Sequence, residues 1–173
     1  MHKWLEPFNH FLLAHEQITN SLLILSSVCM DIITIGLVLW GLFGKTMRPF
    51  LALIILTLMR QIAQALISFP IPQGLIWHYP GFPSLTETYD VATDFFFSSH
   101  VGITALAALA IAKRNFSKTI TYFSVFFVLT MAIFMLTIRA HYTADIIAGC
   151  FAAVTSFLIA GRLSPRIDRF FAR

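Results

Sequence analysis

Residues 119–161 read TITYFSVFFVLTMAIFMLTIRAHYTADIIAGCFAAVTSFLIAG, and this stretch decides the fold. It holds two apolar runs, 119–138 and 143–161, separated by four residues that include Arg139 and His141. Each run has about the 20 residues that a helix needs to cross a bilayer. Neither run alternates polar and apolar residues as the strands of a membrane barrel do. The stretch therefore predicts two membrane-spanning helices with ionisable residues at their connection.

The rest of the chain has the same character. Of its 173 residues, 58% are hydrophobic and only 12% are charged, which excludes a soluble domain. Three further runs of spanning length lie before residue 119, at 21–43, 49–69 and 95–112. We therefore predict one all-α domain over residues 1–173, an integral membrane helical bundle with five spans between residues 21 and 161 and a basic cytoplasmic tail at 162–173.

The N-terminal segment, residues 1–20, differs from these runs. It mixes apolar side chains such as Trp4 and Phe8 with the charged Glu6 and Glu16. This mixture is typical of a helix that lies in the membrane interface. A sixth span is the alternative for this segment.

The basic residues predict the orientation of the bundle. They cluster between the first two spans, between the third and fourth, and after the fifth: Lys45, Arg48, Lys113, Arg114, Lys118, Arg162, Arg166, Arg169 and Arg173. With five spans, these segments share one side, which the positive-inside rule makes cytoplasmic. The connection 70–93 has no Lys or Arg and lies on the opposite side. His100 and His141 begin spans that start there, so the histidines should meet at the extracytoplasmic face.

These histidines suit nucleophilic phosphoryl transfer. His141 and Asp145 are four residues apart at a helix start, so they share a helix face. A carboxylate at one ring nitrogen fixes the histidine tautomer and leaves the other nitrogen free to attack. His100, from another helix, can act as general acid and base. The structural alternative is that both are interfacial histidines bonded to nearby carbonyls. Two of them at one membrane face favour the catalytic interpretation.

Two arginines lie off the cytoplasmic side. Arg139 is adjacent to the site, where it could bind a phosphate oxygen or could simply extend to the interface. Arg60 lies deeper, at a depth similar to that of Asp31 in the preceding span. A buried Arg60–Asp31 ion pair is the simpler interpretation. Phosphate binding by Arg60 is the alternative.

Metal catalysis is the chemical competitor. His100, His141, Asp145 and Asp94 could in principle ligate zinc. No HxxxH, HExxH or paired-cysteine spacing supports such a site, and Cys29 and Cys150 both lie inside apolar runs. We expect neither a metal nor another cofactor.

Two motifs resemble the sphingomyelin synthase branch of the lipid phosphate phosphatase superfamily. That branch carries Asp-x-x-aromatic-Ser-Gly-His, to which Asp94-Phe95-Phe96-Phe97-Ser98-Ser99-His100 is similar. It also carries His-Tyr-Thr/Ser-x-Asp-Val/Ile, which His141-Tyr142-Thr143-Ala144-Asp145-Ile146 matches throughout. Arg60 followed by Pro70-Ile71-Pro72 is a third and less specific likeness. The resemblance runs from about Arg60 to Gly149.

The resemblance implies a six-span bundle with its site at the exoplasmic face. It also implies His141 as the nucleophile, Asp145 as its orienting carboxylate and His100 as the acid/base. We expect the substrate to contact Asp94, Ser98, Ser99, Tyr142, Arg139 and Arg60. The chain departs from the pattern at Ser99, which replaces a glycine, and at Met135, where the phosphatases of the superfamily have an arginine. A site with fewer cationic side chains than those phosphatases have suits a phosphodiester, which carries one negative charge.

The sequence therefore predicts a membrane lipid phosphotransferase that acts on phospholipid head groups through a phosphohistidine. The acceptor would be a lipid alcohol or water. One alternative is a hydrolase, either a lipid phosphatase or a phospholipase C-type enzyme. Another is a non-catalytic protein that binds or moves lipids. We expect membrane and phospholipid as partners, and no nucleic acid.

Overall fold

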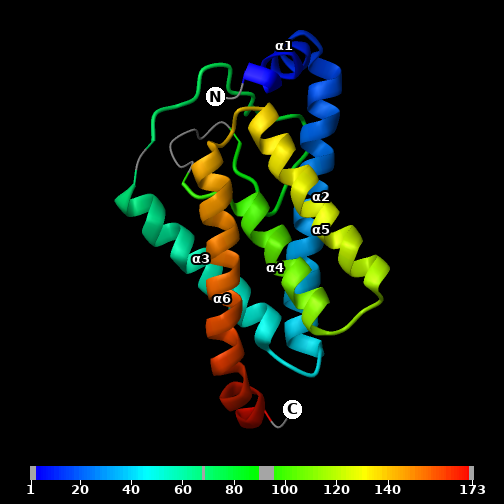
Figure 1. Cartoon of the computed structure of the whole chain (residues 1–173), viewed down its shortest axis with the longest axis vertical. Helices are drawn as coiled ribbons and strands as arrows, with labels where there is room; N and C mark the ends of the chain where they lie inside the picture. The colour runs from blue at the N-terminus through cyan, green and yellow to red at the C-terminus, as the bar shows by residue number, and fades with distance from the viewer. Residues whose placement is uncertain (1–2, 68, 90–95, 172–173) are drawn as a thin grey trace.

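The computed structural model describes residues 3–67, 69–89 and 96–171, which form an all-helical bundle (Figure 1). A short 3-10 helix, η1 (Lys3–Leu5), leads into α1 (Glu6–Ala14). The long helices are α2 (Glu16–Phe43), α3 (Arg48–Leu66), α4 (Ser99–Lys113), α5 (Lys118–Thr137) and α6 (Thr143–Phe170). The predicted all-α class is confirmed.

Among the described residues, four helices have the length and apolar composition to cross a membrane, namely α2, α3, α5 and α6. The fifth predicted span, 95–112, is shorter than expected. Its helix, α4, has 15 residues and begins at Ser99, because Ser98 is extended and its hydroxyl accepts a hydrogen bond from the Val101 N–H as an N-cap. Residues 94 and 95 lie outside the described part of the chain.

The short α4 is the central helix of the bundle. It packs against α2, α3, α5 and α6, and its buried residues include His100, Gly102 and Leu106. A helix enclosed by other helices needs no lipid-facing surface of its own, so its length need not match the bilayer. This position places the N-terminus of α4, and with it His100, inside the bundle.

Close packing joins α4 to α6. A Cβ added at Gly149 would lie 2.7 Å from the backbone oxygen of Ser98, so only glycine fits there. The Ser98 N–H donates to the Asp145 backbone oxygen at 3.2 Å. The starts of the two helices that carry the predicted catalytic residues are therefore fixed against each other.

The N-terminal segment lies across the upper ends of α2 and α5 (Figure 1). At 9 residues, α1 is too short to span a bilayer, which excludes it as a sixth span. The buried Asn9 Nδ2 donates to the backbone oxygens of Gly74 and Thr137, at 3.0 and 2.9 Å, and so ties α1 to α5. The first span is longer than predicted, because α2 begins at Glu16 and not near residue 21.

The opposite end of the bundle is closed by Asp168. Its carboxylate accepts hydrogen bonds from the Thr46 hydroxyl and the Met47 N–H, each at 2.7 Å. The segment predicted as a basic tail is largely helical, since α6 continues to Phe170. The end of α6 is thereby tied to the α2–α3 connection, and the two chain ends lie at opposite ends of the molecule (Figure 1).

Candidate active site

His100 lies in the first turn of α4 and faces a carboxylate that the sequence did not suggest. Its Nε2 is 3.2 Å from Glu87 Oε1, and the two side chains are only 3% and 6% exposed. The ring of Trp77 packs edge-on against the His100 ring, with centroids 5.8 Å apart. The histidine is thus enclosed by side chains from the α3–α4 connection.

Glu87 belongs to that connection, and its burial changes its acidity. Burial raises the pKa of the Glu87 carboxyl to about 7, and the positive charge of Arg60 opposes the rise. A carboxyl with this pKa exchanges protons near neutral pH. The available signal in the sequence was an acidic residue in a connection without Lys or Arg, but nothing local showed that it would be buried.

Asp31 holds the segment that carries Glu87. Its carboxylate accepts hydrogen bonds from the Ser84 hydroxyl, the Leu85 N–H, and both the N–H and hydroxyl of Thr86, at 2.7 to 3.1 Å. The predicted Arg60–Asp31 ion pair is therefore wrong. Arg60 and Asp31 lie at similar depths along their helices, which is why the pair was predicted. The Asp31 carboxylate is bound instead by N–H and hydroxyl groups of the α3–α4 connection.

The same stretch is fixed at two further points. The Tyr89 hydroxyl bonds the Ser27 hydroxyl, one helical turn before Asp31 on α2. Trp77 Nε1 donates to the Thr88 backbone oxygen at 3.1 Å. Contacts on both sides of Glu87 therefore set its position opposite His100.

His141 and Asp145 adjoin at the start of α6. His141 Nδ1 lies 3.6 Å from Asp145 Oδ2, an ion-pair distance slightly beyond a hydrogen bond. The same Oδ2 accepts from the Tyr142 N–H at 2.7 Å, and Asp145 is fully buried. The carboxylate is therefore fixed beside Nδ1, the arrangement that the i, i+4 spacing predicted.

A cavity of about 220 Å³ brings the two histidines together. Both line it, as do Arg60, Glu87 and Ser99. The other lining residues are Gln61, Gln64, Trp77, Thr86, Thr88 and Ala140. Arg60 is in the cavity wall, and its Nε lies 3.4 Å from the Phe97 oxygen, to which it donates. The cavity thus brings together two imidazole rings, a carboxyl group and a guanidinium group.

Ser98 and Tyr142, two other predicted substrate residues, are not among the side chains that line this cavity. Ser98 is fully buried and caps α4. The Tyr142 hydroxyl donates to the Pro70 backbone oxygen at 3.1 Å. Asp94 lies outside the described residues, so its predicted role stays a prediction.

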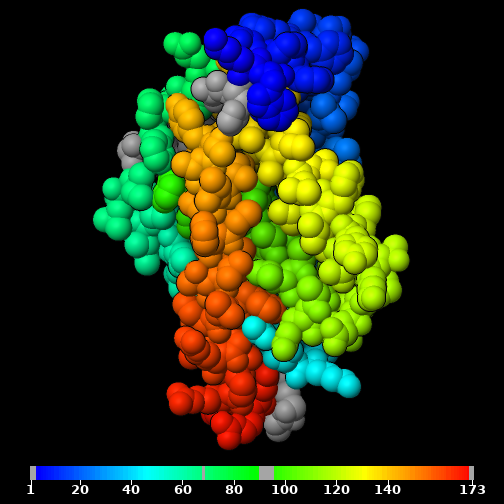
Figure 2. Space-filling view, in the orientation of Figure 1, coloured from blue at the N-terminus to red at the C-terminus, as the bar shows by residue number. Residues whose placement is uncertain are grey.

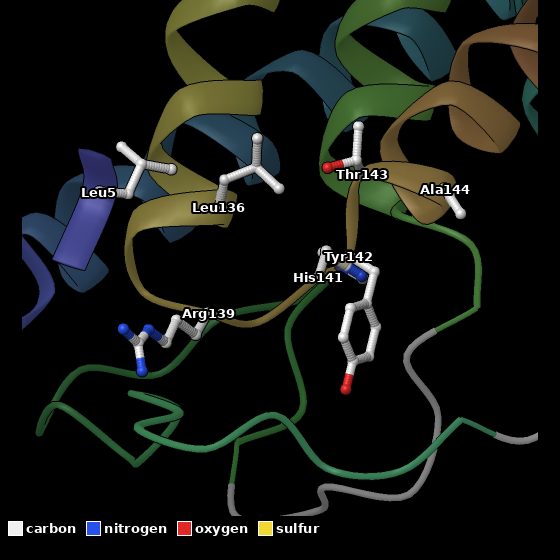
Figure 3. A pocket seen from close by; sticks show the side chains of 7 residues that line it. All are labelled: Leu5, Leu136, Arg139, His141, Tyr142, Thr143 and Ala144. Carbon is white, nitrogen blue, oxygen red and sulfur yellow. The ribbon is translucent and has the colours of Figure 1, made fainter. Parts of the chain in front are cut away.

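Arg139 lines a second and larger cavity, of about 380 Å³, which His141 also lines (Figure 3). Its backbone has the left-handed φ of 57°. Its Nη1 donates to the Gln73 oxygen at 2.8 Å, and its Nη2 is 3.9 Å from Glu6 Oε1. Arg60 and not Arg139 is therefore the arginine beside His100.

Within the described ranges, no three His, Cys, Asp or Glu side chains are grouped to hold a metal ion. The groups that meet in the smaller cavity can supply attack by a ring nitrogen, proton transfer and charge stabilisation. That set is sufficient for nucleophilic displacement at phosphorus.

Residues 3–162 match the model of the AtPDCT1/2 family, a family of lipid phosphotransferases. The match covers most of the chain and includes Glu87, His100, His141 and Asp145. Among curated proteins and solved structures, none matches the chain. The predicted class of lipid-metabolising membrane enzyme is confirmed at this level.

Proposed function

The chain belongs to the AtPDCT1/2 family, the phosphatidylcholine:diacylglycerol cholinephosphotransferase family, and from this premise we propose that it transfers phosphocholine between diacylglycerols. A covalent phosphohistidine at His141 carries the head group between the two lipids. One observation supports this most directly. His141 beside Asp145 and His100 beside Glu87 line one cavity with Arg60.

In the first step, His141 Nε2 attacks the phosphorus of phosphatidylcholine. The N–P bond forms and the P–O bond to the glycerol breaks, while the His100–Glu87 pair gives its proton to the departing oxygen. Diacylglycerol leaves, and phosphocholine stays on His141. Asp145 beside Nδ1 stabilises the positive charge that the ring gains.

In the second step, a different diacylglycerol enters. The His100–Glu87 pair takes the proton of its hydroxyl, the hydroxyl oxygen forms the new P–O bond, and the N–P bond breaks. Arg60 offsets negative charge on the phosphoryl oxygens in both transition states. The two steps are chemically the reverse of each other, so one set of groups serves both.

The test uses purified protein in nanodiscs that contain phosphatidylcholine labelled in its phosphocholine group and unlabelled diacylglycerol of a different chain length. We expect label in phosphatidylcholine with the new chains, and an acid-labile label on the wild-type protein. His141→Ala should lose both. Asp145→Asn should lower turnover by about 10⁴-fold, by analogy with other orienting aspartates.

The products separate the competing functions. Release of free labelled phosphocholine without chain exchange would indicate a hydrolase. Unchanged phosphatidylcholine with wild-type protein would favour the non-catalytic alternative. Full turnover by His141→Ala would exclude the phosphohistidine.

A further inference from the structure

The larger cavity adjoins the catalytic one, because His141 lines both. It lies between η1 and the facing ends of α5 and α6, and its other lining residues are Leu5, Leu136, Arg139, Tyr142, Thr143 and Ala144 (Figure 3). At about 380 Å³ it falls within the size range of small-molecule sites. A molecule held there would have one end at His141.

The two cavities differ in chemistry. Carboxylate, amide and guanidinium groups line the smaller one. The larger one presents mainly hydrocarbon, from Leu5, Leu136, Ala144 and the tyrosine ring, with one guanidinium from Arg139. A charged head group suits the first cavity. Hydrocarbon with a few acceptor oxygens suits the second, since apolar surface favours apolar ligands and an arginine donates to oxygen.

The N-terminal segment covers this position. Figure 2 shows it lying over the upper ends of α5 and α6. Leu5 is buried there, although Trp4 and Phe8 beside it are about 60% exposed. Glu6 and the Gln73 oxygen both contact the Arg139 guanidinium, which fixes it at the edge of the cavity.

We propose that this cavity binds the glycerol-ester region and first methylene groups of a diacyl lipid, with Arg139 donating to its ester oxygens. The inference rests on the proposed function and names where its lipid substrates bind. The reacting oxygen of the leaving or entering alcohol lies opposite His141 Nε2 and next to the His100–Glu87 pair, and the rest of the glycerol lies in the larger cavity. One cavity therefore serves both the departing and the arriving diacylglycerol.

Photolabelling tests the site without requiring turnover. A diacylglycerol with a diazirine beside its ester groups is irradiated with the full-length protein in phosphatidylcholine nanodiscs. We expect the label on peptides that contain Leu136 or Ala144, with competition by unlabelled diacylglycerol. Ala144→Leu should lower this labelling about tenfold, because the added carbons fill the cavity. Val154→Phe adds bulk at an exposed position on the same helix and should leave labelling unchanged.

Chain exchange measured on the same samples separates this inference from the proposed function. Label in the cavity without any wild-type transfer would refute the transferase and leave the lipid site standing. Transfer with label spread evenly over lipid-facing residues, and equal in Ala144→Leu, would refute the site and leave the transferase standing. A diazirine label confined to the smaller cavity would also overturn the proposal.

Discussion

Glu87 is the residue whose ionisation we expect to govern the pH response. Its carboxyl pKa is raised from 4.5 to about 7, so the folded protein keeps a proton there that the unfolded chain has released. Between these two values the folded state binds more protons. The contribution of Glu87 to stability is therefore greatest below about pH 4.5 and falls as pH rises toward 7.

Glu87→Gln should remove that dependence. The thermal midpoint of wild-type protein in detergent should decrease from pH 5 to pH 7.5 more than that of the variant. Turnover should drop by about 10²- to 10⁴-fold, the usual contribution of general acid–base catalysis. Identical pH–stability curves for the two proteins, together with unaltered turnover, would contradict a buried and catalytic Glu87.

Asp31 gives a second test at single-residue scale. Asp31→Asn replaces acceptor oxygen by an amide that faces N–H donors, so the segment around Glu87 should loosen and turnover should fall at least tenfold. Asp168→Asn is the matched control, because that aspartate makes the same kind of contact at the far end of the bundle. It should lower stability while retaining turnover per folded molecule.

The same variants distinguish Asp31 from a partner of Arg60. If the two formed an ion pair, Asp31→Leu combined with Arg60→Met would recover the stability lost by each single change. We expect no such recovery. Recovery in the double variant, measured by thermal unfolding, would restore the predicted pair.

At the scale of helices, the contact between α4 and α6 sets the geometry of the site. Gly149→Ala would place a methyl group 2.7 Å from the Ser98 oxygen and push the start of α4 away from α6. We expect lower stability and lower turnover together. Gly36→Ala, on α2 with no atom within 4 Å of the added carbon, should instead stabilise by about 1 kcal/mol through helix propensity. Equal behaviour of the two variants would contradict this packing.

The sequence predicted the helices well because their signals are local. Apolar runs define α2, α3, α5 and α6, and the i, i+4 spacing alone brings Asp145 to His141. Glu87 is different, since its place depends on hydrogen bonds to Asp31, some 55 residues away in sequence. The prediction of an Arg60–Asp31 pair was wrong because depth along a helix does not give the direction in which a side chain points.

At the scale of the whole molecule, the distribution of basic residues predicts that the site faces outward. A cysteine introduced for labelling should avoid Gly81 and Asn115, whose φ values of +86° and 55° disfavour cysteine. Phe82, in the α3–α4 connection, and Phe43, the last residue of α2, are better positions, since they are 43% and 82% exposed. In a protein lacking Cys29 and Cys150, Phe82→Cys should react with an impermeant thiol reagent on intact cells and Phe43→Cys should not. The reverse pattern would place the site on the cytoplasmic side.

The hydrogen bonds between α2 and the Glu87 segment also connect the site to the thickness of the lipid bilayer. With 28 residues and a rise of about 1.5 Å per residue, α2 is about 42 Å long, more than the roughly 30 Å of a hydrocarbon core. Such a helix accommodates a thinner membrane by tilting. Ser27 and Asp31 bond Tyr89 and Thr86, which lie on either side of Glu87. A tilt of α2 would therefore move the Glu87 carboxylate relative to His100. The rate should therefore vary with the acyl length of the surrounding lipids at constant substrate, and Asp31→Asn should weaken that dependence.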